Sequence, residues 1–499
     1  MRHGVGTLAE PAATALLLVV LGVLLGASAL ASRATRWLGI PTALLFIAVG
    51  LAAGREGLAL ESVPTDAFAF RLGTLALVFI LFDGGLNTPT VTLRRSLGPA
   101  SVLATAGVVG TAALVAVAAH PFGFGWPEGF LLGAIVSATD AATVFALLRH
   151  SGVRLRQRVA GTLELESALN DPTAAILTVG LAVAIATHRL SGWALAGAAA
   201  LQIAVGLVVG LALGLLGRTL LKRYPLPAGG LYAVASVSLA FLAFGAATLL
   251  AGSGLLAVYV AAILIGNEAV RYRTGLHRVH DALAWLSQVA VFLLLGLLVS
   301  PRSLPGVVGP GLAIAAFLTL VARPAVVFAC LAPFGYTPKE TLYVGWVGLR
   351  GAVPVIFALF PALAGVPDAG RLLSLVFFLV VVNALVPGAL VRWLTGRMGL
   401  VSRRPPPPPA ALEITSTQLL EGELLSFYIA PASAAADVTL AELPFPPSAF
   451  AALVVRGQTL VAPRGPTRLL PGDHVFVFCR PDDVSLVRLL FGQTEDEDN

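Results

Sequence analysis

Long apolar runs separated by short polar loops make up most of the chain, a pattern that predicts an all-α polytopic membrane protein. A transmembrane helix needs roughly 20 apolar residues. Glycine and proline interrupt several runs, notably 40–54 and 254–267, which predicts short or broken helices. The thirteen or so expected spans are residues 13–31, 40–54, 70–87, 98–118, 128–148, 161–187, 193–217, 229–250, 254–267, 282–299, 307–331, 338–361 and 370–394.

After the last expected span the pattern changes to the alternation of a small soluble α/β domain. Residues 398–410 contain a run of prolines that predicts a stiff linker. Beyond it, within 411–492, strands are expected at 426–430, 450–456, 459–462 and 474–479, with a helical turn at 438–443 and a final helix reaching Leu490. The chain therefore divides into a transmembrane domain (12–397), a linker and a tail domain. The acidic end, 495–499, is expected to be disordered.

The composition supports a membrane protein over a soluble one. Hydrophobic residues make up 57% of the chain and charged residues 12%, with a mean hydropathy of +0.90. A soluble domain carries about 25% charged residues. The first run, 13–31, is long enough to span a bilayer and is interpreted as a retained span, not a removed signal peptide.

Arginine and lysine sit mainly in alternate loops, and this alternation predicts the orientation. Short basic loops mark the cytoplasmic side. The amino terminus is therefore expected outside and the tail domain in the cytoplasm, in the inner membrane of the cell. The net charge of +6 is spread over these loops, so it does not indicate a nucleic-acid partner. The basic loops contain Arg33 and Arg36; Arg94 and Arg95; Arg149, Arg154, Arg156 and Arg158; Arg218, Lys222 and Arg223; and Arg271, Arg273 and Arg278.

Carboxylates inside adjacent spans are the candidate chemistry. Each costs about 2.5–3.5 kcal/mol at membrane depth on insertion scales, so they are by default functional. Carboxylate, hydroxyl and amide oxygens are the ligands that a desolvated alkali cation needs. The alternative is a purely structural role, in which these polar groups only form hydrogen bonds with one another in a helix bundle. The candidate cation and proton ligands are Asp140, Asp171, Thr139, Ser167 and Asn170.

Two arginines lie in the apolar second half of the chain, Arg323 and Arg350. Neither can stay unpaired in hydrocarbon, so each must meet a carboxylate, backbone carbonyls or a helix carboxyl end. The glycines and proline of 345–354 predict a broken helix around Arg350. A structural role is favoured for both over direct contact with the ion. Asp83, near the cytoplasmic end of its span, could line an access path or pair locally.

Four motifs resemble signatures of the NhaP-type cation/proton antiporters. Ser137–Phe145 and Leu163–Pro172 are similar to the paired carboxylate signatures, and Gly252–Tyr259 and Gly348–Pro354 to further ones. The resemblance extends over about residues 12–397. The tail resembles the TrkA-C (RCK-C) regulatory domains of potassium channels and transporters, mainly through Leu470-Pro471-Gly472-Asp473 and its strand pattern.

The resemblance implies thirteen spans in inverted repeats with broken helices, a core domain that moves against a dimerisation domain, and a homodimer. It implies that Asp140 and Asp171 bind the transported K⁺ or Na⁺ and the proton, assisted by Thr139, Ser167 and Asn170. It also pairs Glu166 with Arg323 as a structural ion pair. Ala141 follows the first aspartate where the sodium branch usually has proline, so the potassium/proton branch is favoured and sodium stays an alternative.

The working hypothesis is a secondary active transporter, not an enzyme, that needs no cofactor. It exchanges a cytoplasmic monovalent cation for a proton by alternating access, electroneutrally, and so serves pH homeostasis. A remote alternative is a cation channel gated by the tail, but the chain contains no repeated pore-loop filter sequence. The tail could sense a small molecule or nucleotide, or serve only as a dimerisation module.

Overall fold

The computed structural model describes most of the chain. The described residues are 15, 18–19, 22–30, 41–54, 66–149, 153–189, 192–268, 270, 272–402, 422–431, 433–457 and 459–491. Four expectations fall wholly or partly outside them: the outward amino terminus, much of the first span, the polyproline linker and the acidic end. The described residues form two compact units. One comprises the residues up to 215 with 238–265 and 280–402, and the other comprises 216–237, 266–279 and the tail.

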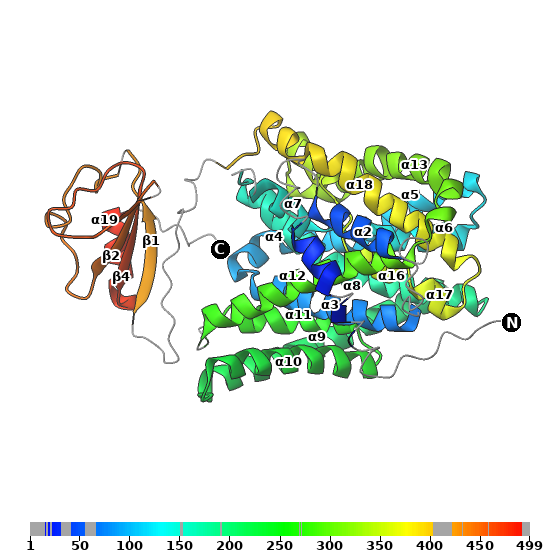
Figure 1. Ribbon diagram of the computed structural model, residues 1–499, viewed down its shortest axis with the longest axis horizontal. Helices are drawn as coiled ribbons and strands as arrows, with labels where there is room; N and C mark the ends of the chain where they lie inside the picture. Colours follow the sequence, from blue (N-terminus) through cyan, green and yellow to red (C-terminus); the bar gives the residue numbers. More distant parts are fainter. Residues whose placement is uncertain are drawn as a thin grey trace. The chain divides into compact units, whose positions relative to one another are not determined.

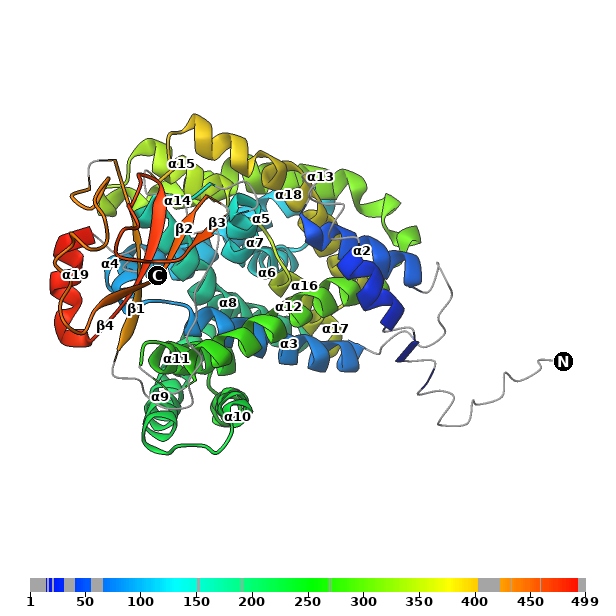
Figure 2. The same ribbon diagram turned by 60° about the vertical axis from the view of Figure 1, so that its left-hand side comes forward.

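The membrane part is a bundle of helices (Figures 1 and 2). Within the described residues, eight helical segments are long and apolar enough to cross a bilayer, and three shorter apolar helices accompany them. Each expected span from 40–54 onward has a helical counterpart, so the predicted all-α polytopic fold is confirmed. The helices of the first half are α2 (Thr42–Ala53), α3 (Asp66–Leu86), α4 (Thr90–Val102), α5 (Val108–Ala119), α6 (Trp126–Ser137), α7 (Ala141–Arg149), α8 (Gln157–Ala186) and α9 (Gly192–Arg223).

The second half continues with helices of very different length. Short 3-10 turns, such as Pro301–Ser303 and Ala332–Phe334, separate several of them. The helices are α10 (Gly229–Leu249), α11 (Gly254–Gly266), α12 (Arg273–Leu298), α13 (Val308–Phe317), α14 (Arg323–Leu331), α15 (Pro338–Trp346), α16 (Val353–Phe357), α17 (Phe360–Ala364) and α18 (Ala369–Arg397).

One order of elements occurs twice along the chain. A long span with a π-helical turn is followed by a helix broken in the middle, and then by a long helix with an internal proline. The first set is 93–122 with its π turn at Leu103–Gly107, then α6 and α7, then α8 with Pro172. The second set is 301–334 with its π turn at Leu318–Ala322, then α15 and α16, then α18 with Pro387, with the short α17 (Phe360–Ala364) between α16 and α18. π turns are rare and occur frequently at functional sites.

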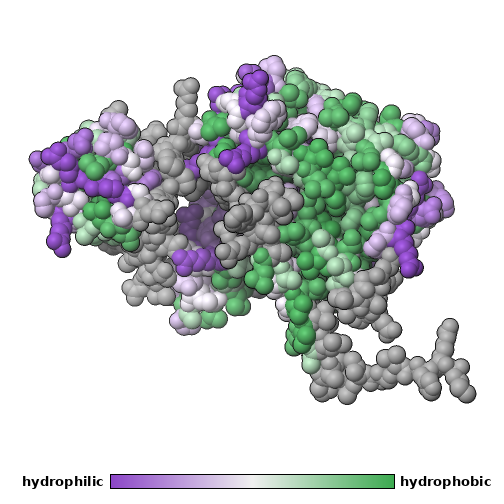
Figure 3. Space-filling model, turned by 45° about the horizontal axis from the view of Figure 1, so that its top comes forward, coloured by the Kyte–Doolittle hydropathy of each residue, from purple (hydrophilic) through white to green (hydrophobic). Residues whose placement is uncertain are grey.

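Large apolar side chains cover much of the outside of the membrane part. Figure 3 shows a broad hydrophobic face bounded by groups of hydrophilic residues. Helix α9 is the extreme case, because only 17% of its most apolar stretch is buried. Its inner side packs closely on α11: a Cβ at Gly210 would lie 2.8 Å from the carbonyl oxygen of Ala257. Such a surface suits lipid contact.

A short antiparallel bridge joins the loop before α8 to the segment after α18, at the end of the bundle that is predicted to face the cytoplasm. Leu155, in the loop before α8, pairs with Val401, just after α18. The Arg156 N–H donates to the Leu400 carbonyl (3.0 Å) and the Ser402 N–H to the Arg154 carbonyl (2.8 Å). We refer to these two segments, 154–156 and 400–402, as the strap. Leu155 and Leu400 are both buried in one apolar cluster, so these two side chains attach the strap to the core.

The tail folds as a four-stranded antiparallel sheet in the order β1-β4-β2-β3, with one helix. The strands are β1 (Glu423–Tyr428), β2 (Phe450–Arg456), β3 (Thr459–Val461) and β4 (Asp473–Cys479), and the helix is α19 (Val484–Phe491). The predicted strands and final helix are confirmed within a few residues. The helical turn expected at 438–443 is wrong, because its N–H groups bond to another loop: Leu440 donates to Thr467 and Ala441 to Gly465.

One buried carboxylate explains why the tail carries Pro471-Gly472-Asp473. Asp473, 1% exposed, accepts two hydrogen bonds from Arg456 (2.9 and 2.8 Å). It also accepts the Leu470 N–H at 2.8 Å, which fixes the turn before β4. Gly472 has φ of +94°, a conformation that side chains disfavour. The motif is therefore a structural turn.

Candidate functional site

The span expected at 128–148 is not one continuous helix. Helix α6 ends at Ser137, residues 138–140 are not helical, and α7 starts at Ala141. Asp140 caps α7: its Oδ1 accepts the Thr143 N–H (3.1 Å) and its Oδ2 accepts the Thr143 hydroxyl (2.6 Å). An aspartate at a helix start satisfies otherwise unpaired N–H groups. Asp140 therefore lies in a break, which we call the first break.

The second break lies between α15 and α16, where the sequence predicts one. Thr337 and Glu340 form a capping box at the start of α15, and residues 347–352 separate the two helices. The Asp140 N–H donates to the Leu349 carbonyl at 2.8 Å, so the two breaks are hydrogen-bonded to each other. A Cβ added to Gly351 would overlap the Asp140 carboxylate. Only glycine permits this approach.

Helix α8 supplies polar side chains to the first break. The Ser167 hydroxyl donates to the Thr139 carbonyl (2.8 Å) and accepts the Ala141 N–H (3.2 Å). The Asn170 side-chain amide donates to the Thr139 hydroxyl at 2.7 Å. These bonds satisfy backbone groups that a break would otherwise leave open in an apolar setting. The structure thus brings Thr139, Ser167 and Asn170 together.

Asp171 lies on the same helix and is 4% exposed. Asp140 is the charged group close enough to repel it. The Asp171 Oδ1 and the Asn170 Oδ1 are buried, and neither has a hydrogen-bond partner among the described residues. Both oxygens can act as ligands for a cation, and the Asp171 carboxylate can also take up a proton. The site therefore has two buried oxygen atoms, on Asp171 and Asn170, that are free to bind an ion within the described part of the chain.

Glu166 and Arg323 form a buried ion pair. The Arg323 Nη2 lies 2.5 Å from the Glu166 Oε1, and the two side chains are 4% and 0% exposed. Arg323 starts α14 directly after the π turn at 318–322. Its guanidinium also lies against the second break, since a Cβ at Gly348 would be 2.8 Å from the Arg323 Nε. The pair thus links α8 to the second break.

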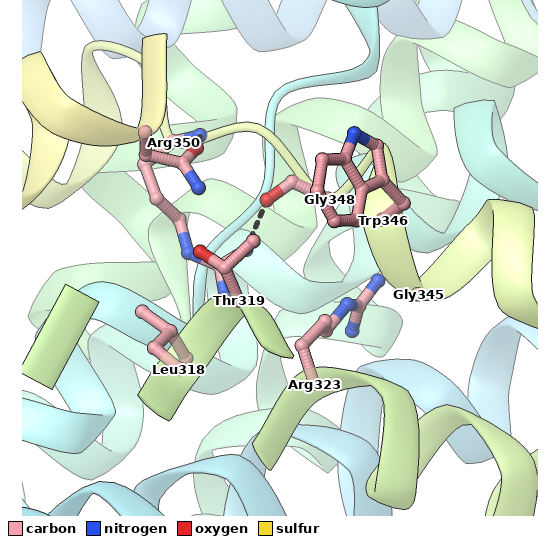
Figure 4. Close-up of a pocket in the computed structure, with 8 residues that line it drawn as sticks. Leu318, Thr319, Arg323, Gly345, Trp346, Gly348 and Arg350 are labelled. Atoms are coloured by element: carbon pink, nitrogen blue, oxygen red, sulfur yellow. Dashed lines mark hydrogen bonds between the residues drawn. The ribbon is translucent and has the colours of Figure 1, made fainter. Parts of the chain in front are cut away.

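Arg350 occupies the second break itself and is 3% exposed. Its Nη1 donates to the Gly348 carbonyl at 2.8 Å, and its backbone N–H donates to the Asn383 Oδ1 at 2.7 Å. Arg323 and Glu166 are the charged groups that face it. Figure 4 shows Arg350 and Arg323 entering one small cavity from different elements. The break carbonyls and a long-range amide therefore hold the second break together.

Asp83 is set differently from the other candidates. It lies on α3, and its described hydrogen bond is with the Asn87 side chain, one helical turn on (3.1 Å). Asp281, from α12, is the carboxylate that faces it. A role for Asp83 in an access path stays a prediction.

Three residues at the site were not singled out from the sequence: Thr143, Gly351 and Asn383. The first had a signal, because Asp-x-x-Thr is typical of a helix start with an aspartate cap. Gly351 belonged to a motif interpreted only as a helix breaker. Asn383 had no signal, since a lone asparagine in an apolar span gives no indication of its partner.

Comparison with known proteins identifies two regions. A family model described as "Sodium/hydrogen exchanger, transmembrane" matches residues 15–396, and a TrkA-C domain model matches residues 424–492. The K(+)/H(+) antiporter NhaP of Alkalimonas amylolytica is 38% identical over 475 residues, covering 94% of this chain and 82% of that protein. The K(+)/H(+) antiporter NhaP2 of Shewanella baltica is 36% identical, covering 95% and 83%.

More distant similarities point the same way. The Na(+)/H(+) antiporter NhaS2 of Synechocystis is 29% identical over 422 residues, covering 81% of this chain and 75% of that protein. Among solved structures, the sodium proton antiporter MjNhaP1 from Methanocaldococcus jannaschii superposes with a TM-score of 0.67. It is 23% identical and covers 77% of this chain and 99% of its own. At that identity the structural likeness bears on the fold.

Proposed function

Because the chain belongs to the sodium/hydrogen exchanger family, we propose that it exchanges a cytoplasmic monovalent cation for a proton across the membrane by alternating access. It is a multi-pass membrane transporter by its helices and its family. The observation that carries the residue assignment is the buried Asp171 Oδ1, which is unpartnered among the described residues and lies close enough to Asp140 for the two carboxylates to repel each other. Thr139, Ser167 and Asn170 shape this site, and Asp140 and Asp171 bind the cation or the proton.

The charged residues around the two breaks favour electroneutral exchange. When all are ionised, three carboxylates (Asp140, Glu166 and Asp171) and two guanidinium groups (Arg323 and Arg350) sum to a formal charge of −1. One monovalent cation or one proton brings that sum to zero. An uncompensated buried charge is costly, so the carrier crosses most readily with one or the other bound. This supports one cation exchanged for one proton.

Potassium is the favoured cation. The relatives from Alkalimonas and Shewanella, which match more than nine tenths of this chain, are K⁺/H⁺ antiporters. The more distant Synechocystis relative is a Na⁺/H⁺ antiporter, so Na⁺ is the second candidate. The alanine after Asp140 agrees with the potassium branch.

The remaining parts of the proposal concern the setting of the transporter. The protein acts in the inner membrane as a homodimer, with its amino terminus outside and its tail in the cytoplasm. The tail regulates exchange by binding a small molecule or a nucleotide. Basic residues within the strap, Arg154 and Arg156, support the orientation.

Reconstituted protein tests the exchange directly. In proteoliposomes with an imposed pH gradient, adding K⁺ on the opposite side should dissipate the gradient, with Rb⁺ and Na⁺ compared at equal concentration. A channel would instead carry cation without moving protons and would respond to membrane voltage. Cation flux that leaves the pH gradient intact would refute the proposal, and stronger exchange with Na⁺ than with K⁺ would reverse the cation preference.

A further inference from the structure

The two aspartates of the site are held very differently. Both oxygens of the Asp140 carboxylate accept hydrogen bonds from one residue, Thr143, through its backbone N–H and its hydroxyl. The Asp171 Oδ1 has no partner among the described residues. Thr143 lies in the first turn of α7, so it ties the Asp140 side chain to that helix.

The rest of the first break leaves the Asp140 side chain little freedom. Its backbone is fixed by the bond from its N–H to the Leu349 carbonyl, and Gly351 lies directly against its carboxylate. The Oδ2 atom accepts the Thr143 hydroxyl at 2.6 Å. Oδ1 is held separately by a backbone N–H, which no substitution except proline removes.

We propose that Thr143 is a positioning residue for the transported cation: its hydroxyl fixes Asp140 Oδ2 so that the carboxylate is pre-oriented toward the space beside Asp171. This inference rests on the proposed function and names a residue that sets cation affinity. A carboxylate oxygen has more than one lone pair, so Oδ2 can accept the Thr143 bond and still coordinate a cation. Pre-orientation of a ligand lowers the cost of binding.

A purely structural role of Thr143, as a cap of α7, would lead to a different result. If Thr143 only started α7, removing its hydroxyl would reduce the amount of folded protein, and the molecules that fold would bind cation normally. Thr143→Val separates the two cases, because valine has nearly the shape of threonine and keeps the backbone N–H bond to Oδ1. Thr143→Ser keeps the hydroxyl and removes only a methyl group.

The experiment uses the full-length protein in proteoliposomes, with the KM for K⁺ and kcat measured separately at one fixed pH. Thr143→Val should raise KM about tenfold, which corresponds to about 1.4 kcal/mol, and change kcat much less. Thr143→Ser should restore a KM within about twofold of the wild type. Thr248→Val is the matched control, because the exposed Thr248 hydroxyl donates to the Phe244 carbonyl within α10, a helix that contributes no residue to the site.

Each outcome decides the question. An unchanged KM in Thr143→Val, or an equal rise in Thr143→Ser, overturns the positioning role. If Thr143→Val yields too little folded protein, the KM of Thr143→Ser and that of Thr143→Asn, which also carries a donor, give the comparison: a rise of more than about threefold in both overturns it. The proposed function fails separately, when wild-type protein shows no cation-dependent proton flux at all.

Discussion

The two breaks meet at one hydrogen bond, from Asp140 to Leu349, yet they are built from opposite materials. The first break and the neighbouring part of α8 hold carboxylates, hydroxyls and an amide, and the Asp171 Oδ1 on α8 is unpartnered among the described residues. The second holds glycines and Arg350, and its backbone groups are tied to Asn383 and to the arginine itself. A long span with a π turn precedes each break, and a long helix with an internal proline follows it. In the proposed exchange, the first break and α8 provide the oxygen ligands, and the second break provides the compensating positive charge.

The largest loss of exchange should come from removing the Asp171 carboxylate. Asp171→Asn removes the carboxylate that has an unpartnered oxygen, so no proton can be exchanged there. Cation-dependent proton flux in proteoliposomes should fall to the level of empty vesicles, while size-exclusion chromatography shows folded protein. Full activity in this variant would show that Asp171 does not bind the transported cation or proton.

Removing the positively charged partner of the buried ion pair should mainly lower the stability of the fold. Arg323→Leu leaves Glu166 as a lone buried charge, which should cost about 3–5 kcal/mol. Thermal unfolding in detergent would measure this as a large fall in Tm. The double variant Glu166→Leu with Arg323→Leu should recover most of that stability, because a buried pair replaced by apolar groups is often neutral. No recovery would mean that the pair does more than neutralise itself.

The contact between the breaks can be tested with one methyl group. Gly351→Ala places a Cβ against the Asp140 carboxylate and should displace it. A displacement of about 1 Å at a reacting group can cost about 100-fold, so exchange should fall about 10- to 100-fold. Gly396→Ala, on α18 with open space around it, is the matched control and should behave as wild type. Equal activity of the two variants would mean that the breaks do not need this close approach.

The smallest effect should come from a surface charge cluster that serves as a reference for the buried pair. Glu268 bonds to Lys222 (2.5 Å) and to Arg218. The bond from Lys222 lowers the pKa of Glu268, so the cluster stabilises the fold at neutral pH and loses that contribution as pH falls through the lowered pKa. Glu268→Gln should cost less than about 1 kcal/mol. The difference in Tm from wild type should shrink further at acidic pH; a difference that grows there would contradict this.

The sequence predicted the second break but not the first, for a physical reason. Gly348, Gly351 and Pro354 disfavour a continuous helix whatever surrounds them. The first break, Ala138-Thr139-Asp140, contains residues that a helix tolerates. It is open because Ser167 and Asn170 reach it from α8 and because Leu349 accepts its N–H. Those contacts join distant parts of the chain, and hydropathy along one segment carries no information about them.

The partners of the buried arginines show the same limit. Burial alone requires that Arg323 and Arg350 be compensated, and the sequence says so. It does not say that Arg350 would be held by a carbonyl two residues away and, through its backbone, by Asn383. Family resemblance supplied the pairing of Glu166 with Arg323, whereas residue patterns alone left it open. The fold class was accessible from apolar length, and the site geometry was not.

The strap also bears on how two of the long helices are held together. Its second segment, 400–402, immediately precedes the linker, and its first segment, 154–156, leads directly into α8. The two hydrogen bonds therefore tie the start of α8, which carries Ser167, Asn170 and Asp171, to the end of α18, which carries Asn383. The two helices that reach the two breaks are thus coupled at this end through the backbone.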